Sequence, residues 1–504
     1  MFHAYAKGDS GVEAMGIHSL ERGGGGGVNY SQRYQHARDY GEKKGGTMSE
    51  LPTFLEKGQR ARLFPVLADT SREGRTLSIF LSCFCAVDEL GRSLLASVGK
   101  KAGKTSRIEA FTEIVFKSKG GEGKVRPDGL IIVTTGSRRW SAIVEAKVGN
   151  AKVDPGQVEE YAKLARNHGV DAVITISNQF ATLPEHHPVK LPKPLTKHVG
   201  LYHWSWMYVM TVATLLLSDG DVADADQKNI LREFLRFLNH PSSGVSSFDR
   251  MNAEWKDLVA AVKAGAKISR SDPAVENTIA SWHQEVRDLC LILSRRIERE
   301  VHVKLRWAHL IDPIRRLRDD CDLLSQSKAL ECELSIPDAA STLKIKADLQ
   351  TRCVNVWMNL QAPGDRQSAK AKLNWVLRQL TKTDDPDVHV RANWAGRAGS
   401  TQALLNILKT APEVIEHTRK GVVPRSFDIL LVRDMAGKFS GSGTFILGLE
   451  EAVPAFYEQV GQYLKAWQPS APKIKGDDEV VNGTQNEIKL DSSTSQLSES
   501  VGED

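Results

Sequence analysis

The stretches Arg126–Gly129 (Arg-Pro-Asp-Gly) and Glu145–Lys147 (Glu-Ala-Lys) decide how this 504-residue sequence is interpreted. The chain between them is rich in β-branched residues and contains a glycine turn, which predicts a hairpin of two strands over 125–135 and 140–148. Because side chains alternate along a strand, Glu145 and Lys147 share one face of the second strand. Carboxylates on neighbouring strands beside a lysine can hold a divalent metal ion next to a phosphate. An exposed strand face has the same pattern, so the flanking sequence has to distinguish the two interpretations.

Upstream of the hairpin, apolar residues at helical spacing predict one helix over 76–98 and a second over 107–117. The basic turn between them has three residues between its first glycine and the Gly-Lys pair, where a phosphate-binding loop has four, and no strand precedes it. On the second predicted helix Glu109 and Glu113 are four residues apart and therefore project to one side.

Downstream of the hairpin, Asp154 begins a helix with complete terminal signals. Asp154 is a good N-cap, Pro155 follows it in the first turn, and Gly169 marks the end. Gln157 and Tyr161 are separated by one turn of this helix, and a buried strand is predicted over 171–177. The predicted order is therefore helix, strand, strand, helix, strand.

This order and these residues resemble the PD-(D/E)XK nuclease superfamily, which has the restriction-endonuclease-like fold. Asp128 with the proline before it matches the first half of the signature, and Glu145–Lys147 matches the second half. Gln157 and Tyr161 match the QxxxY motif of the RecB-like branch. The resemblance extends over residues 105–180 and implies an α/β core of α-β-β-α-β order, with a mixed sheet flanked by helices.

The resemblance also implies a metal site for Mg²⁺ or Mn²⁺. Asp128, Glu145 and the main-chain carbonyl of Ala146 would be ligands. Glu113 or Glu109 would complete the site through a water molecule. A hard cation that keeps open water positions suits this set of oxygen atoms.

Three further residues would act in catalysis. Lys147 would orient the attacking water, stabilise negative charge or serve as a general base. Gln157 and Tyr161 would position the phosphate backbone or the catalytic lysine. Both are also ordinary residues for a helix, as a residue near its N-cap and as a half-buried tyrosine.

The chain is predicted to have four parts. A glycine-rich extension over 1–47 precedes the nuclease-like domain over 48–245, which two helices over 202–217 and 230–238 complete. An α+β domain of unknown function follows over 246–467, and a disordered acidic tail over 468–504. The α+β domain has helices predicted over 253–264, 274–300, 367–380 and 453–467, and strands predicted over 330–336, 342–349, 354–360, 388–394 and 427–432.

Charge and composition narrow the choice of partners. The tail has three lysines and eight acidic residues, net −5, so the rest of a chain of net charge +5 carries about +10 and favours an anionic partner. The loop over 184–198 carries Lys190, Lys193 and Lys197, which could contact phosphates, and His186 and His187, which we expect to be exposed.

The sequence favours a cytoplasmic protein that does not bind a membrane. The most apolar run, 204–217, is shorter than the roughly 20 residues of a spanning helix, and no apolar signal core is found at the N-terminus. The six cysteines are dispersed without a CxxC pair, which argues against a zinc site or a redox motif.

The prediction is a metal-dependent nuclease that hydrolyses phosphodiester bonds, with DNA as the expected partner, in bacterial defence or DNA repair. The sequence is also compatible with a homodimer. The second domain could bind a protein or a regulatory partner. The alternative is a catalytically inactive nuclease-fold protein that binds nucleic acid or protein. The presence of every signature residue argues against inactivity.

Overall fold

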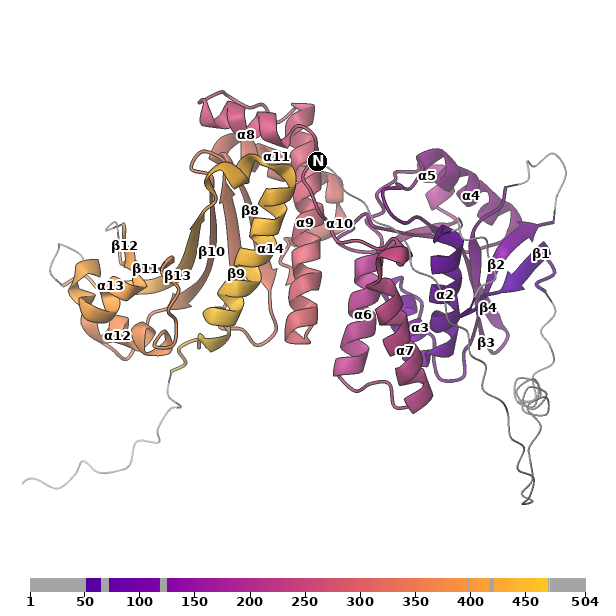
Figure 1. The fold of residues 1–504 in the computed structure, drawn as a ribbon, viewed down its shortest axis with the longest axis horizontal. Helices are drawn as coiled ribbons and strands as arrows, with labels where there is room; N and C mark the ends of the chain where they lie inside the picture. Colours follow the sequence, from indigo (N-terminus) through magenta and orange to yellow (C-terminus); the bar gives the residue numbers. More distant parts are fainter. Residues whose placement is uncertain are drawn as a thin grey trace, which may run out of the picture.

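The computed structural model describes residues 51–64, 72–117, 125–396, 399–416, 421–469 and 471. Two β-sheets lie side by side, each with its own helices (Figure 1). The predicted extension over 1–47 and almost all of the predicted tail lie outside the described residues. None of the described helices is long and apolar enough to cross a membrane.

The first sheet contains six strands in the order of the sequence, β1-β2-β3-β4-β5-β6. Its strands are β1 (Leu55–Arg60), β2 (Arg107–Phe116), β3 (Gly129–Thr135), β4 (Arg138–Ala146), β5 (Ala172–Ser177) and β6 (Gly200–Ser205). Strands β1 to β4 pair antiparallel, whereas β4-β5 and β5-β6 pair parallel. The start of β3 and the ends of β4, β5 and β6 therefore meet at one edge of a mixed sheet, as the predicted hairpin requires.

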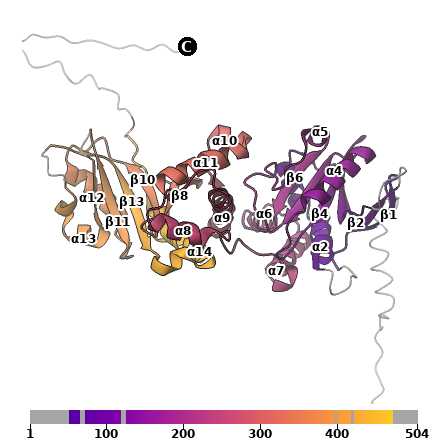
Figure 2. The same cartoon turned by 90° about the horizontal axis from the view of Figure 1, so that it is seen from above.

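Helices cover both faces of this sheet. On one face lie α2 (Arg72–Ala86), α3 (Asp88–Ser97), α6 (Trp206–Ser218) and α7 (Ala225–Leu238), and on the other lies α4 (Pro155–His168), with the short α5 (Lys193–Thr196) beside it (Figure 2). Along β4, Val144 packs in the core under α2 and α6, whereas Ile143 packs against α4. The alternation predicted for this strand is confirmed, and Glu145 lies on the α4 face.

The helix predicted over 107–117 is wrong, because this segment is strand β2. Its pairing with β1 is irregular, and Glu113 has a left-handed backbone with φ of 53°. A bulge shifts the alternation of side chains by one residue. Phe111, Ile114 and Phe116 consequently enter one core cluster, at spacings of three and two residues that obscure the alternation of a strand.

Several other boundaries differ from prediction. The helix predicted over 76–98 is interrupted at Val87 into α2 and α3, and the segment predicted as a helix over 202–217 begins as strand β6. The last helix is α14 (Ser442–Gln459) rather than 453–467. It contains Pro454, which is disfavoured inside a helix. Helix α11 (Pro313–Ser327) and strand β12 (Ser400–Leu404) were missed.

The second sheet is antiparallel, in the order β12-β11-β13-β10-β9-β8-β7. Its other strands are β7 (His302–Val303), β8 (Ala329–Ser335), β9 (Leu343–Asp348), β10 (Cys353–Gln361), β11 (Val388–Trp394) and β13 (Pro424–Asp434). The helices of this part include α8 (Trp255–Lys263), α9 (Pro273–Ile297), α10 (Trp307–Ile311), α12 (Ala369–Gln379), α13 (Leu405–Thr410) and α14. The α+β prediction for this half is confirmed in outline. Helix α9 packs against α6 of the first part, so it lies between the two sheets (Figures 1 and 2).

Candidate metal centre

The two signature stretches meet where β3 begins and β4 ends. The amide of Ala146 donates a hydrogen bond of 3.0 Å to Oδ2 of Asp128, which ties the residue before β3 to the last residue of β4. Gly129 permits this close packing, because a Cβ atom there would lie 2.9 Å from Leu81 Cδ1 and 3.2 Å from the carbonyl oxygen of Phe111. Pairing of the Lys147 amide with the Ile176 carbonyl, at 2.8 Å, turns the main-chain groups of Lys147 toward β5. Those of Ala146 therefore face Asp128.

Asp128 and Glu145 form a pair of carboxyl groups, of which Glu145 is buried and Asp128 is half-buried at the border of a cavity. Glu145 is 1% exposed, and its Oε2 accepts no hydrogen bond from a donor among the described residues. Burial, followed by the charge of Glu145, raises the pKa of Asp128 from 3.8 to about 7, against the opposing effects of the Ala146 amide and the charge of Lys147. Two carboxyl groups that interact while largely withdrawn from water favour a shared proton or a bound cation.

Lys147 supplies positive charge to this pair. Its Nζ donates to Glu145 Oε1 at 2.6 Å and lies 3.6 Å from Oε2 of Glu73, in the first turn of α2. Burial lowers the pKa of Lys147, but the hydrogen bond and charge of Glu145, with the charges of Glu73 and Asp128, outweigh it and raise the pKa above its ordinary value. A protonated lysine favours charge stabilisation over the general-base role considered from the sequence.

Helix α4 brings Gln157 and Tyr161 to the same place. Asp154 caps the helix as predicted, accepting a hydrogen bond from the amide of Gly156. Nε2 of Gln157 donates to the hydroxyl of Tyr161 at 2.8 Å, and this hydroxyl lies 3.4 Å from the carbonyl oxygen of Arg126. Burial, followed by the charge of Glu145, raises the pKa of Tyr161, so the phenol is neutral and borders the carboxyl pair.

The two candidate glutamates of the predicted helix are separated by the strand that replaces it. Four residues of strand span roughly 13 Å, so Glu109 and Glu113 do not reach one site. Glu109 contacts Arg60 and Arg107, at 2.8 and 3.1 Å. Glu113 instead lines a cavity of about 560 Å³ together with Asp128, and Gln59 donates to its Oε2 at 3.1 Å.

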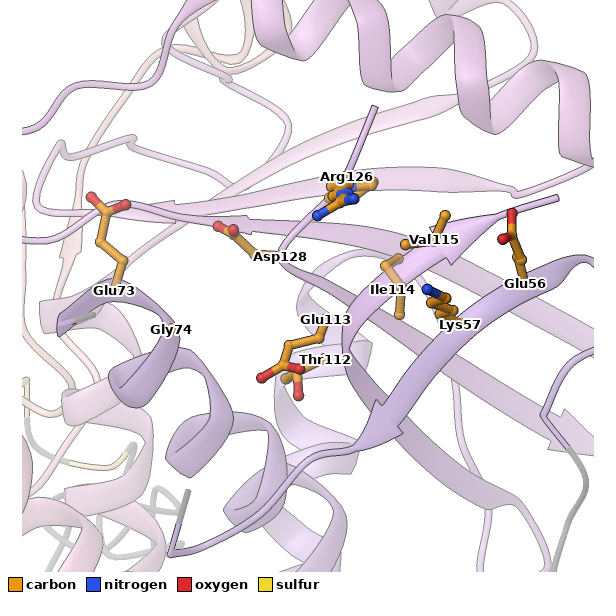
Figure 3. A pocket seen from close by; sticks show the side chains of 11 residues that line it. Glu56, Lys57, Glu73, Gly74, Thr112, Glu113, Ile114, Val115, Arg126 and Asp128 are labelled. Atoms are coloured by element: carbon orange, nitrogen blue, oxygen red, sulfur yellow. The ribbon is translucent and has the colours of Figure 1, made fainter. Parts of the chain in front are cut away.

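Charged side chains line this cavity beside Asp128. Figure 3 shows Glu73, Glu113 and Asp128 around a common space, with Arg126 and Lys57 at its border. Glu73 is not predictable from the sequence, because an acidic residue in the first turn of a helix is ordinary and belongs to no motif. Glu56 also lines the cavity, so its carboxylates outnumber its cations.

The backbone at Glu113 yields a prediction on stability. A left-handed backbone conformation at a residue with a side chain costs about 1 kcal/mol or more, and glycine removes this cost. We expect Glu113→Gly to raise the free energy of unfolding by about 1 kcal/mol in urea denaturation. Glu113→Gln keeps the backbone cost and should stay close to the unaltered protein. A less stable Glu113→Gly protein would show that this backbone is not strained.

The loop between β5 and β6 does not extend into the cavity. Lys190, Lys193 and Lys197 are exposed on it, and none of them lines the cavity around Asp128. The exposure predicted for the two histidines is wrong. His186 Nε2 lies 2.8 Å from the carbonyl oxygen of Leu310, and the ring of His187 is half-buried against β5 and β6.

His187 belongs to a hydrogen-bonded row beside Glu145 that the sequence did not reveal. Thr175 is the partner of Glu145 on β5, and His203 is the partner of Thr175 on β6, so the three side chains share one face. Thr175 Oγ1 lies 2.8 Å from His187 Nε2 and 2.7 Å from His203 Nδ1, and His203 Nε2 lies 2.8 Å from the carbonyl oxygen of Gln179. All of these hydrogen bonds can form when the His187 and His203 rings are both neutral.

The two histidines predict how stability depends on pH. Burial lowers the pKa of His187 to about 3 and that of His203 to about 4, below the ordinary value of 6.5. Between about pH 6.5 and 4 these histidines bind protons in the unfolded chain but not in the folded chain. Their contribution to the free energy of unfolding is therefore present above this window and is lost as the pH falls. The loss is up to about 1.4 kcal/mol per pH unit for each histidine.

Urea denaturation at several pH values measures this dependence. Relative to the unaltered protein, His203→Gln should gain in midpoint as the pH falls from 7 to 4, because it lacks the loss of stability that His203 contributes. A difference in midpoint that does not change with pH would contradict the assignment of a neutral, buried ring.

The oxygen atoms at this edge fit a hard divalent cation. Within the described residues, no group of three or more His, Cys, Asp or Glu side chains could hold a metal ion. The site instead offers the carboxyl groups of Asp128 and Glu145, with an orphaned Oε2, and the Ala146 carbonyl facing them. A small number of carboxylates with main-chain oxygen and water is the environment that Mg²⁺ prefers.

A comparison of this sequence with protein-family models finds no match. Comparison with curated proteins finds no match either. The function is therefore inferred from the geometry of the site.

Proposed function

We propose that this chain is a metal-dependent nuclease that hydrolyses phosphodiester bonds, with DNA as its expected substrate. The observation that carries the proposal is the pair of half-buried Asp128 and buried Glu145 at one sheet edge, with a protonated Lys147 beside it. A pair of this kind is costly in a fold unless a cation occupies it. The resemblance of these residues to the PD-(D/E)XK signature points to the same chemistry.

Asp128, Glu145 and the carbonyl of Ala146 would hold Mg²⁺ or Mn²⁺. When bound, the ion supplies positive charge for the scissile phosphate and lowers the pKa of a coordinated water. Glu145 is already desolvated, and Asp128 is fixed by the Ala146 amide, so little reorganisation accompanies ion binding.

Lys147 places a cation in direct contact with the carboxyl pair, through Glu145. The contact with Trp206, whose Nε1 donates to the carbonyl of Lys147 at 2.9 Å, holds its backbone against α6. An ammonium group has three N–H donors, and Glu145 accepts from one of them. The others can orient a water molecule or donate to a phosphate oxygen. Tyr161 lies near the pair as a neutral donor, and Gln157 holds its hydroxyl through a hydrogen bond.

The carboxylates around the cavity make substrate binding depend on the cation. Glu56, Glu73, Glu113 and Asp128 face Lys57 and Arg126, so the metal-free cavity repels a phosphate backbone. Addition of a divalent ion reverses this balance close to Asp128. We therefore expect nucleic acid to enter this cavity only in the presence of the metal.

A cleavage assay tests the proposal. The metal-free chain is incubated with plasmid, linear duplex, single-stranded DNA and RNA, each with Mg²⁺, Mn²⁺ or EDTA. Cleavage should require metal and should disappear in Asp128→Ala. Cleavage that persists in EDTA or in Asp128→Ala would contradict the site, and binding without cleavage under every condition would favour an inactive binding module.

A further inference from the structure

An exposed apolar surface lies on the second part of the chain, at α10 and the start of α11. Trp307 is 76% exposed, Ile311 is 58% exposed and Ile314 is 46% exposed. Trp307 and Ile311 are one turn apart on α10 and therefore lie on the same side of it. Ile314 follows the corner at Asp312, which caps α11. We call these three side chains the α10–α11 patch.

Exposed cations border the patch, and carboxylates follow them in the sequence. Residues 302–318 contain five Lys or Arg and one Asp, which caps α11, and Asp319, Asp320 and Asp322 come next. Lys304 and Arg315 are 56% and 58% exposed. Their acidic neighbours are 3.4 Å and 3.9 Å away, and ion pairs this exposed are weak. These cations are therefore available to an incoming anion.

The patch adjoins the candidate nuclease part of the chain. The contact of His186 with the Leu310 carbonyl fixes α10 to the loop between β5 and β6, and NH1 of Arg316 donates to Thr182 Oγ1 at 2.8 Å in the same region. This loop continues into α5 with its exposed lysines. Helices α10 and α5 lie on the same side of the molecule (Figure 2).

We propose that the α10–α11 patch binds unpaired nucleotides of a nucleic-acid strand. Trp307 would stack on a base, and Lys304, Arg306 and Arg315 would contact the neighbouring phosphates. An exposed aromatic ring among cations is the combination that binds single strands, because every base has a face for stacking and every linkage has a charge. A duplex keeps those faces covered by neighbouring base pairs.

Charge favours this occupant over a protein. A stable protein interface buries about 800 Å² on each partner around an apolar centre depleted of charge. Three apolar side chains bordered by cations are smaller and more strongly charged than such a centre. The inference rests on the proposed function, since the bound strand would be the substrate of the Asp128 site.

Binding in EDTA tests the patch separately from the metal site. The full chain is titrated into a fluorescent DNA strand of about 20 nucleotides, a duplex of the same sequence and the matching RNA strand, and anisotropy is recorded. We expect the unpaired strands to bind more tightly than the duplex. Trp307→Ala should weaken strand binding about tenfold, and Trp307→Phe should retain most of it. Tyr463→Ala, which removes another exposed aromatic ring, is the matched control.

Three results would overturn the inference. These are unchanged strand affinity in Trp307→Ala, equal binding of duplex and single strand, and a dimer of the chain that Trp307→Ala dissociates, which would assign the patch to a second copy. If the strand binds through Trp307 but no metal supports cleavage, the proposed function fails and the inference stands.

Discussion

Lys147→Ala is expected to lower metal-dependent cleavage about 10²- to 10³-fold while metal binding persists. The ammonium group is the only charged donor in hydrogen-bond contact with Glu145 among the described residues, so its loss removes charge stabilisation next to the scissile phosphate. The same loss leaves Glu145 buried without its counter-charge, which should strengthen the affinity for a cation. Cleavage rates with labelled DNA and Mg²⁺ titrations monitored by thermal unfolding measure the two effects.

Lys163→Ala is the matched control. Lys163 lies on α4 and forms an exposed i,i+4 pair with Glu159, so its removal should leave cleavage and metal affinity unchanged. Lys147→Arg keeps the charge but changes the shape of the donor group and should cleave at an intermediate rate. Wild-type cleavage by Lys147→Ala would contradict the role assigned to the lysine.

Asp128→Asn is expected to make the metal-free protein more stable and to abolish its response to metal. The folded pKa of Asp128 is raised from 3.8 to about 7, so its contribution to stability is present below the ordinary pKa and is lost as the pH rises through about 7. The amide substitution removes that loss, and should raise the free energy of unfolding by roughly 2–4 kcal/mol at pH 8 and by little at pH 4. An asparagine can still accept the Ala146 hydrogen bond and can donate to the orphaned Glu145 oxygen.

Thermal unfolding with and without Mg²⁺ tests this result. Mg²⁺ should raise the midpoint of the unaltered protein but not that of Asp128→Asn, which should also lack cleavage. Asp154→Asn is the control, because asparagine caps a helix as well as aspartate does. A less stable Asp128→Asn protein that still responds to Mg²⁺ would contradict the description of the carboxyl pair.

Much of this edge was predictable because its signals are local. The hairpin follows from β-branched residues around a glycine turn, and α4 follows from Asp154, Pro155 and Gly169. Once the hairpin is antiparallel, Asp128 and Glu145 must lie at the same end, since one precedes β3 and the other is near the end of β4.

The features that the sequence did not predict correctly depend on contacts between segments that are distant in the chain. The bulge at Glu113 changes which side chains of β2 face the core, and only the pairing with β1 reveals it. Glu73 reaches Lys147 because α2 packs across the sheet, and no spacing in the sequence shows this. The Thr175–His203 row likewise arises from the parallel pairing of β5 and β6. The function expected for residues 246–467 was left open, and the patch around Trp307 now offers a hypothesis for part of it.

The most direct test of the paired carboxyl groups as a metal site is a titration of the metal-free chain with Mn²⁺, followed by electron paramagnetic resonance of the free ion. The unaltered protein and Lys147→Ala should remove Mn²⁺ from solution, and Asp128→Asn and Glu145→Gln should not. Equal Mn²⁺ binding by Asp128→Asn and the unaltered protein would contradict the proposed metal centre.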